Sequence, residues 1–146
     1  MRIGIASDHA GIKMRKQVVE ILQAQGYVVV DFGPQKSIPV DYPDFAQGVC
    51  HGIQSEDLDR GILICGTGVG MCIAANRFTG IRAAVGNEKI VCKAREHNDI
   101  NVICFGARVQ TIDEVLACLD CFLHVESSTQ PRHRKRIDKL DIIGGL

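Results

Sequence analysis

Short apolar runs alternate with amphipathic stretches along the whole chain. The runs are rich in Ile, Leu and Val and end in Gly, Ser or Cys, which is typical of buried parallel strands. The stretches between them repeat apolar residues at helical spacing, as Ile12, Val18, Val19 and Leu22 do. Strands are predicted at residues 2–7, 27–32, 61–65, 81–85 and 101–105. Helices are predicted at residues 11–25, 45–55, 70–78, 88–96, 111–123 and 131–140.

The order of these elements predicts the fold class. Strands that alternate with helices form a parallel sheet with helices on both faces, so we predict a three-layer α/β domain around five parallel strands, followed by a basic C-terminal helix. Residues 1–146 contain no linker or internal repeat and are predicted to form one domain. In such sheets ligands bind beyond the carboxyl ends of the strands, which here points to residues 8–9, to 65–70 and to those after 85 and 105.

A loop with alternating glycines, Gly66-Thr67-Gly68-Val69-Gly70, separates the third predicted strand from the next helix. Such a turn directs backbone N–H groups and the positive end of the helix dipole at one point, which favours an anion. One or two glycines serve a tight turn, whereas three in alternation indicate close approach of a ligand. The loop is not a dinucleotide-binding fingerprint, because Met71 replaces the last glycine, and no Gly-Lys-Ser/Thr of a Walker loop follows.

Cys65 precedes this loop at the end of the strand. A helix N-terminus lowers a thiol pKa from about 8.5 to near 7, so this thiol is a candidate base beside an anion site. The alternative is an inert buried cysteine, since the chain has seven cysteines, mostly in apolar runs. The odd number predicts reduced thiols rather than a disulfide framework, and Cys118 and Cys121 are interpreted as residues of an apolar helix face.

Two polar pairs are further candidates. Asp8-His9 closes the first strand, although an Asp that caps the following helix beside a surface His explains this pair as well. His97-Asn98 ends a predicted helix, where the dipole favours His and where Asn stops a helix. We predict that both pairs lie on one edge of the sheet and form a polar constellation there.

Basic residues gather near the C-terminal end. Residues 132–139 contain five Lys or Arg and one Asp, and Arg132 and Arg136 share a helix face because they are four positions apart. Two guanidinium groups on one face suit a phosphate dianion, whereas a solvated basic helix is the ordinary alternative. Arg108, which follows the fifth predicted strand, is a third candidate for the same ligand.

Composition narrows the classes of function. Seventeen basic and 17 acidic residues give a formal net charge of zero, which argues against binding to nucleic acid or to an anionic membrane. No apolar run approaches the ~20 residues that a membrane helix needs. The N-terminal segment lacks the pattern of a signal peptide, and a cytoplasmic location is expected.

Together these motifs resemble those of the type B ribose-5-phosphate isomerases, a family that includes the subunits of galactose-6-phosphate isomerase. The resemblance covers essentially the whole chain. It implies a flavodoxin-like or Rossmann-like α/β/α domain that forms a homodimer or sometimes a tetramer. It also implies interconversion of D-ribose 5-phosphate and D-ribulose 5-phosphate, in the pentose phosphate pathway, without a metal or an organic cofactor. The residues that carry the resemblance are 7–11, 41–44, 65–70, 73–77, 95–102 and 132–133.

The resemblance implies catalytic roles for individual residues. Cys65 would be the base that moves a proton between C1 and C2 of the open-chain sugar. Thr67 and the amides of residues 66–70 would hold the enediolate oxygen, and His97 would help to open the furanose ring. One branch of the family has a glutamate base just after the glycine loop, but that position here is Met71, so the cysteine branch fits.

The remaining implied roles concern binding. Asp8 and Asn98 would bind hydroxyl groups, and Tyr42 would line the substrate pocket. Some phosphate ligands would come from a partner subunit. The phosphate would be held by His9, Arg108, Arg132 and Arg136.

Three alternatives remain open from the sequence. The first is an isomerase of a six-carbon aldose phosphate, such as allose or galactose 6-phosphate, which the pocket near Tyr42 would decide. The second is a non-catalytic sugar-phosphate sensor, against which Cys65 argues. The third is a nucleotide-binding domain in which Glu88 meets a ribose, against which the missing third glycine argues.

Overall fold

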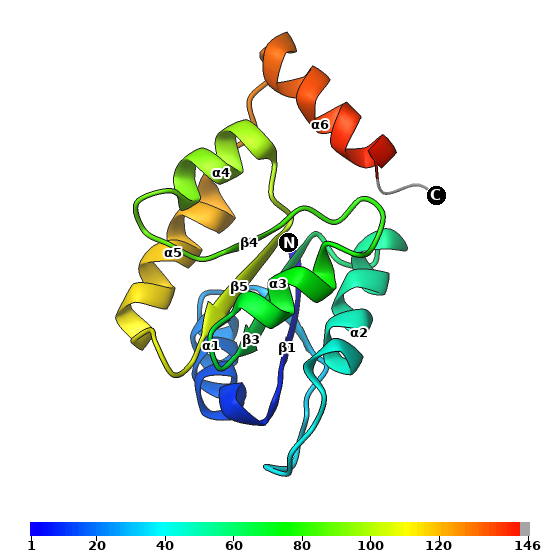
Figure 1. The fold of residues 1–146 in the computed structure, drawn as a ribbon. Helices are drawn as coiled ribbons and strands as arrows, with labels where there is room; N and C mark the ends of the chain where they lie inside the picture. The colour runs from blue at the N-terminus through cyan, green and yellow to red at the C-terminus, as the bar shows by residue number, and fades with distance from the viewer. Residues whose placement is uncertain (144–146) are drawn as a thin grey trace.

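A computed structural model describes residues 1–143 of the chain. Five strands form one sheet in the order β2-β1-β3-β5-β4, and each neighbouring pair is parallel (Figure 1). The predicted five-stranded parallel sheet is therefore confirmed. The strands are β1 (Arg2–Ser7), β2 (Val28–Asp31), β3 (Arg60–Cys65), β4 (Ala83–Val85) and β5 (Val102–Gly106).

Helices follow the strands as predicted, with shifted ends. α2 begins three residues earlier than predicted, because Pro43 suits the first turn of a helix. The last helix extends three residues further than predicted. In the part of the chain that is described, no helix is long and apolar enough to cross a membrane. The helices are η1 (a 3-10 turn, His9–Gly11), α1 (Ile12–Ala24), α2 (Tyr42–Gln54), α3 (Val69–Ala75), α4 (Val91–Asn98), α5 (Ile112–His124) and α6 (Pro131–Ile143).

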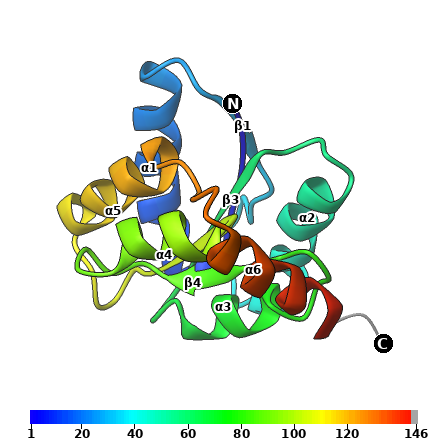
Figure 2. The same cartoon turned by 90° about the horizontal axis from the view of Figure 1, so that it is seen from above.

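The sheet separates two apolar layers. Ile62 and Ile64 of β3 pack into a cluster with residues of α1, α4 and α5. Leu63 and Cys65 point the other way, as the alternation along a strand requires, and pack with residues of α2 and α3. Figure 2 shows these two helix groups on opposite sides of the strands. The three-layer α/β/α architecture is thus confirmed, and Cys65 belongs to the layer of α2 and α3.

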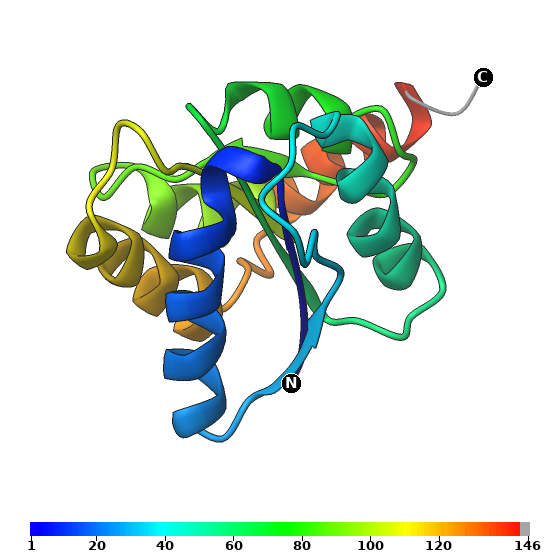
Figure 3. The same cartoon turned by 90° about the horizontal axis from the view of Figure 1, so that it is seen from below.

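The order of the strands creates a topological switch point at one edge of the sheet. The chain leaves β1 toward β2 on one side, and β3 lies on the other side of β1. Ligands bind at such a switch point in open α/β sheets. Figure 3 views the molecule from the carboxyl ends of the strands, where Asp8 follows β1 and Cys65 ends β3. α6 lies at the opposite, amino edge (Figure 1).

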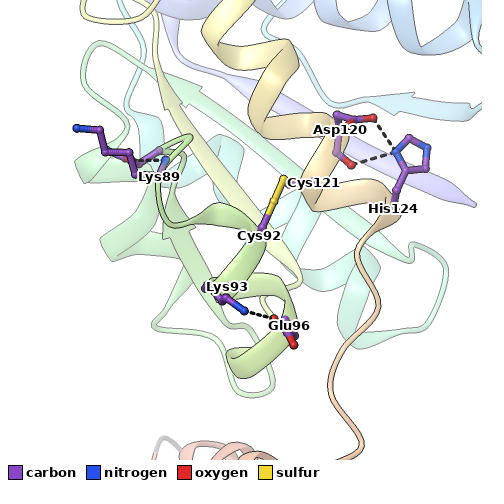
Figure 4. The surroundings of a disulfide bond; sticks show 8 residues. Lys89, Cys92, Lys93, Glu96, Asp120, Cys121 and His124 are labelled. Carbon is purple, nitrogen blue, oxygen red and sulfur yellow. Dashed lines mark hydrogen bonds and ion pairs between the residues drawn. A yellow bond between two sulfur atoms is a disulfide. The ribbon is translucent and has the colours of Figure 1, made fainter.

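Two cysteines differ from the prediction. Cys92 of α4 and Cys121 of α5 form a disulfide, with their Cα atoms 5.0 Å apart (Figure 4). The prediction of reduced thiols is therefore wrong for this pair, and Cys121 is more than an apolar-face residue. The pairing could not be predicted from the sequence, because only the packing of α4 against α5 brings together two residues 29 positions apart. Cys118 is a free, buried core residue, as predicted.

Candidate active site

The chain itself explains the glycines of the loop after β3. Gly68 has a left-handed φ of 82°, and a Cβ there would lie 3.0 Å from the carbonyl carbon of Phe105. A Cβ on Gly70 would lie 2.9 Å from the ring of Tyr42, and one on Gly66 would lie 3.3 Å from the Arg108 guanidinium. The three alternating glycines predicted close approach of a ligand. In the structure, β5, Tyr42 and Arg108 approach these glycines closely. The glycines let the loop fit between these groups.

Cys65 lies beneath this loop at the end of β3, with 4% of its surface exposed. Its Sγ accepts a hydrogen bond from the backbone N–H of Gly68, at 3.2 Å. An N–H group that points at sulfur interacts more strongly with a thiolate than with a thiol. Cys65 belongs to the apolar cluster on this side of the sheet, which includes Ala46 of α2 and Met71 of α3. The Cys65 thiol, the Gly68 N–H and the surrounding apolar side chains form a site that is shielded from solvent. Such a site suits a nucleophile or a base.

Asp8 and His9 lie at the same edge, next to β3. The Asp8 N–H donates to the carbonyl of Ile64 at 3.0 Å. The Oδ1 atom of Asp8 accepts from the N–H groups of Ala10 at 2.8 Å and Gly11 at 3.3 Å, so Asp8 caps the 3-10 turn. The Nδ1 atom of His9 accepts from the N–H of Val40 at 3.3 Å. That bond leaves the proton of a neutral His9 ring on Nε2, which can donate to a ligand.

Arg108 and Thr67 border the loop on the side of β5. The Arg108 N–H donates to the Gly66 carbonyl at 3.0 Å, and its side chain is exposed above that glycine. A cavity of about 360 Å³ opens beside them, and Thr67, Glu88 and Gln110 belong to its lining. Cys65 does not line this cavity. The cavity therefore meets the outer side of the loop, and the thiol lies on its inner side.

The other predicted residues lie elsewhere. α4 starts after β4 at the carboxyl edge and runs back against the strands, so His97 and Asn98 lie near Val102, where β5 begins. α6, which carries Arg132 and Arg136, packs against α4 at this amino edge (Figure 1). The prediction that both polar pairs share one edge is therefore wrong. A helix that connects two parallel strands must return the chain to the amino edge, so its C-terminal residues lie far from the strand exits.

The amino edge nevertheless holds an ordered group of basic side chains. The ring of His97 stacks on that of His133, with centroids 4.3 Å apart and an angle of 8° between the planes. His133 is buried, and burial lowers its pKa, as do the charges of His97, Arg132 and Arg136. Arg132 and Arg136 themselves are exposed. This edge therefore offers the two exposed guanidinium groups of Arg132 and Arg136 beside an imidazole.

Asp99 links α4 and α6, the two helices that carry this group. It adopts a left-handed φ of 50° at the end of α4, and its carboxylate pairs with Arg82 at 3.1 Å and with Arg95. Arg134 of α6 lies 3.6 Å from the same carboxylate. Sequence reasoning missed Asp99, and the only available sign was its place next to the helix-ending His97-Asn98 pair.

Sequence reasoning also missed Arg15. This side chain is fully buried near the carboxyl edge of the sheet, where it contacts the ends of β1 and β2. A sign was present, because Arg15 is three and seven positions before Val18 and Leu22 and therefore interrupts the apolar face of α1.

Comparison with known proteins shows one consistent family. Residues 3–140 match the family model described as Ribose/Galactose Isomerase. The chain is 38% identical to ribose-5-phosphate isomerase B of Escherichia coli, over 97% of this chain and 95% of the relative. A solved structure of ribose-5-phosphate isomerase B from Clostridium thermocellum superposes with a TM-score of 0.95 at 43% identity, over 99% of this chain and 98% of that one. The Mycoplasma genitalium enzyme, crystallised with bound ribulose-5-phosphate, gives 0.92 at 41% identity, over 99% and 96%.

Proposed function

The chain belongs to the ribose/galactose isomerase family, and from this premise we propose that it interconverts D-ribose 5-phosphate and D-ribulose 5-phosphate. The observation that carries the proposal is the Cys65 thiol beneath a loop of backbone amides, at the switch point of the sheet. Aldose–ketose exchange needs a base beside a carbonyl carbon, donors where negative charge develops, and a handle that positions the reacting carbons. Each need has a candidate in this chain.

The base is the thiolate of Cys65. It removes the proton from C2 of the open-chain aldose, and the electron pair of the C–H bond forms the C1–C2 double bond of an enediolate. The thiol then returns the proton to C1, while a proton moves from the C2 hydroxyl to O1, which yields the ketose. No net oxidation or added reactant is needed. In the reverse direction the same sulfur takes the proton from C1.

The donors come from the glycine loop. The Gly68 N–H points at the Cys65 sulfur, so it stabilises the thiolate rather than the enediolate. The hydroxyl of Thr67 accepts from the Val69 N–H at 3.4 Å and keeps its own proton to donate. We therefore assign the enediolate oxygen to Thr67 and to the N–H of Gly70, in the first turn of α3.

Binding of the sugar involves both edges of the molecule. At the carboxyl edge, Nε2 of His9 and the guanidinium of Arg108 bind the phosphate, Asp8 accepts from a hydroxyl, and Tyr42 closes one wall. At the amino edge a second set would open the furanose ring and complete the phosphate site. That set is His97, Asn98, Arg132 and Arg136.

A second copy of the chain unites the two sets. They lie on opposite edges of one chain, so we propose a homodimer in which the amino edge of one copy faces the carboxyl edge of the other. Exposed apolar side chains support such an interface: Ile73 of α3 is 61% exposed, and Ile142 of α6 is 76% exposed. A groove of about 390 Å³ beside Asn98 and Leu140 adds to this surface. A tetramer would require a further interface, and we propose a cytoplasmic location for the assembly.

An activity screen tests the proposal. The purified chain is assayed with ribose 5-phosphate, allose 6-phosphate and galactose 6-phosphate. The highest kcat/KM is expected with ribose 5-phosphate, together with exchange of substrate protons in deuterated water. Preference for a six-carbon substrate would replace the pentose with the hexose alternative. Absence of both turnover and exchange with all three sugars would refute the isomerase assignment.

A further inference from the structure

Arg15 is a charged side chain with no exposed surface, in the middle of the amphipathic helix α1. An arginine is almost never fully buried unless it is paired. Removing a charge from water costs several kcal/mol even after relaxation, so its partners must compensate for that loss. The partners of Arg15 therefore show what this buried charge is for.

Its guanidinium contacts three separate segments. Nη1 donates to the hydroxyl of Ser7 at 2.7 Å, at the end of β1. Nε lies 3.0 Å from a carboxylate oxygen of Asp31, at the end of β2. Nη2 donates to the carbonyl of Pro34 at 2.7 Å, in the loop that follows β2. One side chain thus joins two strand ends to the start of the longest loop between a strand and a helix.

The loop of residues 32–41 is held at its two ends. It contains no helix or strand, and residues 35–39 are exposed. It protrudes at the carboxyl edge of the sheet (Figure 1). Its first residues are tied at Gly33, whose N–H donates to Asp31 at 2.8 Å and whose carbonyl accepts from Ser7 at 3.0 Å. Asp31 and Ser7 are also the partners of Arg15, so the anchor of the loop is built around that guanidinium.

The far end of this loop reaches the candidate site. The N–H of Val40 donates to Nδ1 of His9 at 3.3 Å and so sets which ring nitrogen carries the proton. Tyr42, which begins α2 directly after the loop, places its ring against Gly70. His9, which the loop contacts through Val40, and Tyr42, which follows the loop, are both proposed binding groups, and neither contacts Arg15.

We propose that Arg15 is a positioning residue of this active site, which fixes the 32–41 loop and thereby the tautomer of His9 and the position of Tyr42. The inference rests on the proposed function, because it assigns His9 and Tyr42 to substrate binding. Arg15 acts on binding rather than on proton transfer, since Cys65 and the glycine loop belong to β3 and α3.

The experiment compares Arg15→Met, Arg15→Lys and Asp31→Asn with the unchanged protein. We expect Arg15→Met to raise KM for ribose 5-phosphate roughly 10-fold or more and to keep kcat within about threefold. The reason is that a displaced His9 would make a weaker charge-assisted hydrogen bond to the phosphate, and weakening such a bond lowers affinity by about this factor. Lysine keeps the charge but reaches fewer acceptors, so Arg15→Lys should restore part of the affinity. Asp31→Asn removes the negative charge of one partner but keeps an acceptor oxygen, so it should shift KM in the same direction by less. Lys16→Met removes an exposed cation from the same helix and serves as the control, with KM unchanged.

A second readout does not depend on activity. Amide hydrogen exchange of residues 33–41 should quicken in Arg15→Met and stay unchanged in Lys16→Met. The chain has no Trp and two Tyr, so a Tyr27→Phe background leaves Tyr42 as the only strong emitter, and its quenching by acrylamide should rise in Arg15→Met. If the unchanged protein shows no isomerase activity, the proposed function fails while these readouts still decide on Arg15.

The proposal is overturned if folded Arg15→Met keeps the KM, the exchange rates and the quenching of the unchanged protein. If Arg15→Met does not fold, Arg15→Lys and Asp31→Asn decide instead. Normal KM and normal exchange in both would refute the positioning role.

Discussion

At the scale of single residues, four thiols share one apolar cluster, and three of them have clearly different pKa values. Cys50, Cys65, Cys72 and Cys104 all pack on the α2 and α3 side of the sheet. Burial raises the pKa of Cys50 to about 12 and that of Cys104 well above its ordinary value. Hydrogen bonds from Cys104 and then from Asn76 lower the pKa of Cys72 to about 7. The position of a cysteine in this cluster, and not its mere presence, therefore decides its chemistry.

Replacement of the proposed base is the most direct residue-scale test. We expect Cys65→Ala to lower kcat by about 10³-fold or more, because general acid–base groups contribute 10²–10⁴-fold. Binding of ribose 5-phosphate, measured by calorimetry, should change little, since other groups hold the phosphate. Cys72→Ala is the matched control and should keep kcat within about twofold. Near-normal turnover of Cys65→Ala would remove the cysteine mechanism.

The lowered pKa of Cys72 predicts how thiol reagents behave. Only the thiolate reacts with iodoacetamide, so raising the pH through about 7 should increase the labelling rate of half-buried Cys72 to a plateau. Peptide mass spectrometry after timed labelling measures this rate. Asn76→Ala removes one of the bonds that favour the thiolate and should shift the midpoint upward. A midpoint near the ordinary thiol value of about 8.5 would contradict the expectation.

At the scale of elements, the strands could be predicted but their neighbours could not. Ile62, Leu63 and Ile64 are apolar on both faces, and only a strand covered on both sides needs that pattern. Periodicity is local, so it gave neither the position of β5 between β3 and β4 nor the Cys92–Cys121 pairing. The wrong prediction for His97 had another cause. A helix between parallel strands ends at the amino edge, so the C-terminal residues of α4 could have been placed there from the order of elements alone.

Helix α6 has a testable part in phosphate binding. Its buried side is made by His133 and Ile137, whereas Arg136 is exposed, so Arg136→Ala should leave the packing of α6 intact. We expect KM for ribose 5-phosphate to rise about 10-fold or more while kcat changes by a few-fold, since charge-assisted bonds to phosphate act mainly on binding. Steady-state kinetics measure both. Lys135→Ala, also exposed, is the control, and an unchanged KM in Arg136→Ala would take α6 out of the site.

The disulfide between α4 and α5 should contribute to stability. It closes a loop of about 30 residues, for which the chain-entropy model gives about 3.6 kcal/mol of unfolding free energy. Reduction with dithiothreitol is therefore expected to lower Tm by roughly 10 °C, as scanning calorimetry at fixed protein concentration would measure. The double variant Cys92→Ser/Cys121→Ser should show the lower Tm with and without reductant. Equal Tm values for oxidised and reduced protein would contradict the expected contribution.

At the scale of the whole molecule, the proposed site residues of one chain lie on two opposite edges. The carboxyl edge carries the thiol, the glycine loop, His9 and Arg108. The amino edge carries His97, which is proposed to open the ring, and the exposed guanidinium groups of Arg132 and Arg136. The Asp99–Arg134 pair links the end of α4 to α6. In the proposed dimer, facing edges of two copies supply each site with both sets, so we predict that assembly is a condition for activity.

Mixing two inactive variants tests this arrangement. Cys65→Ala lacks the base, and His97→Ala/Arg136→Ala lacks the amino-edge set. If equal amounts are unfolded together and refolded, half of the dimers contain one chain of each kind, and each such dimer has one intact site. About a quarter of the activity of the unchanged protein should therefore return, because a two-fold dimer has two equivalent sites. Refolding either variant alone is the control. If every site drew both sets from a single chain, the mixture would stay as inactive as its components.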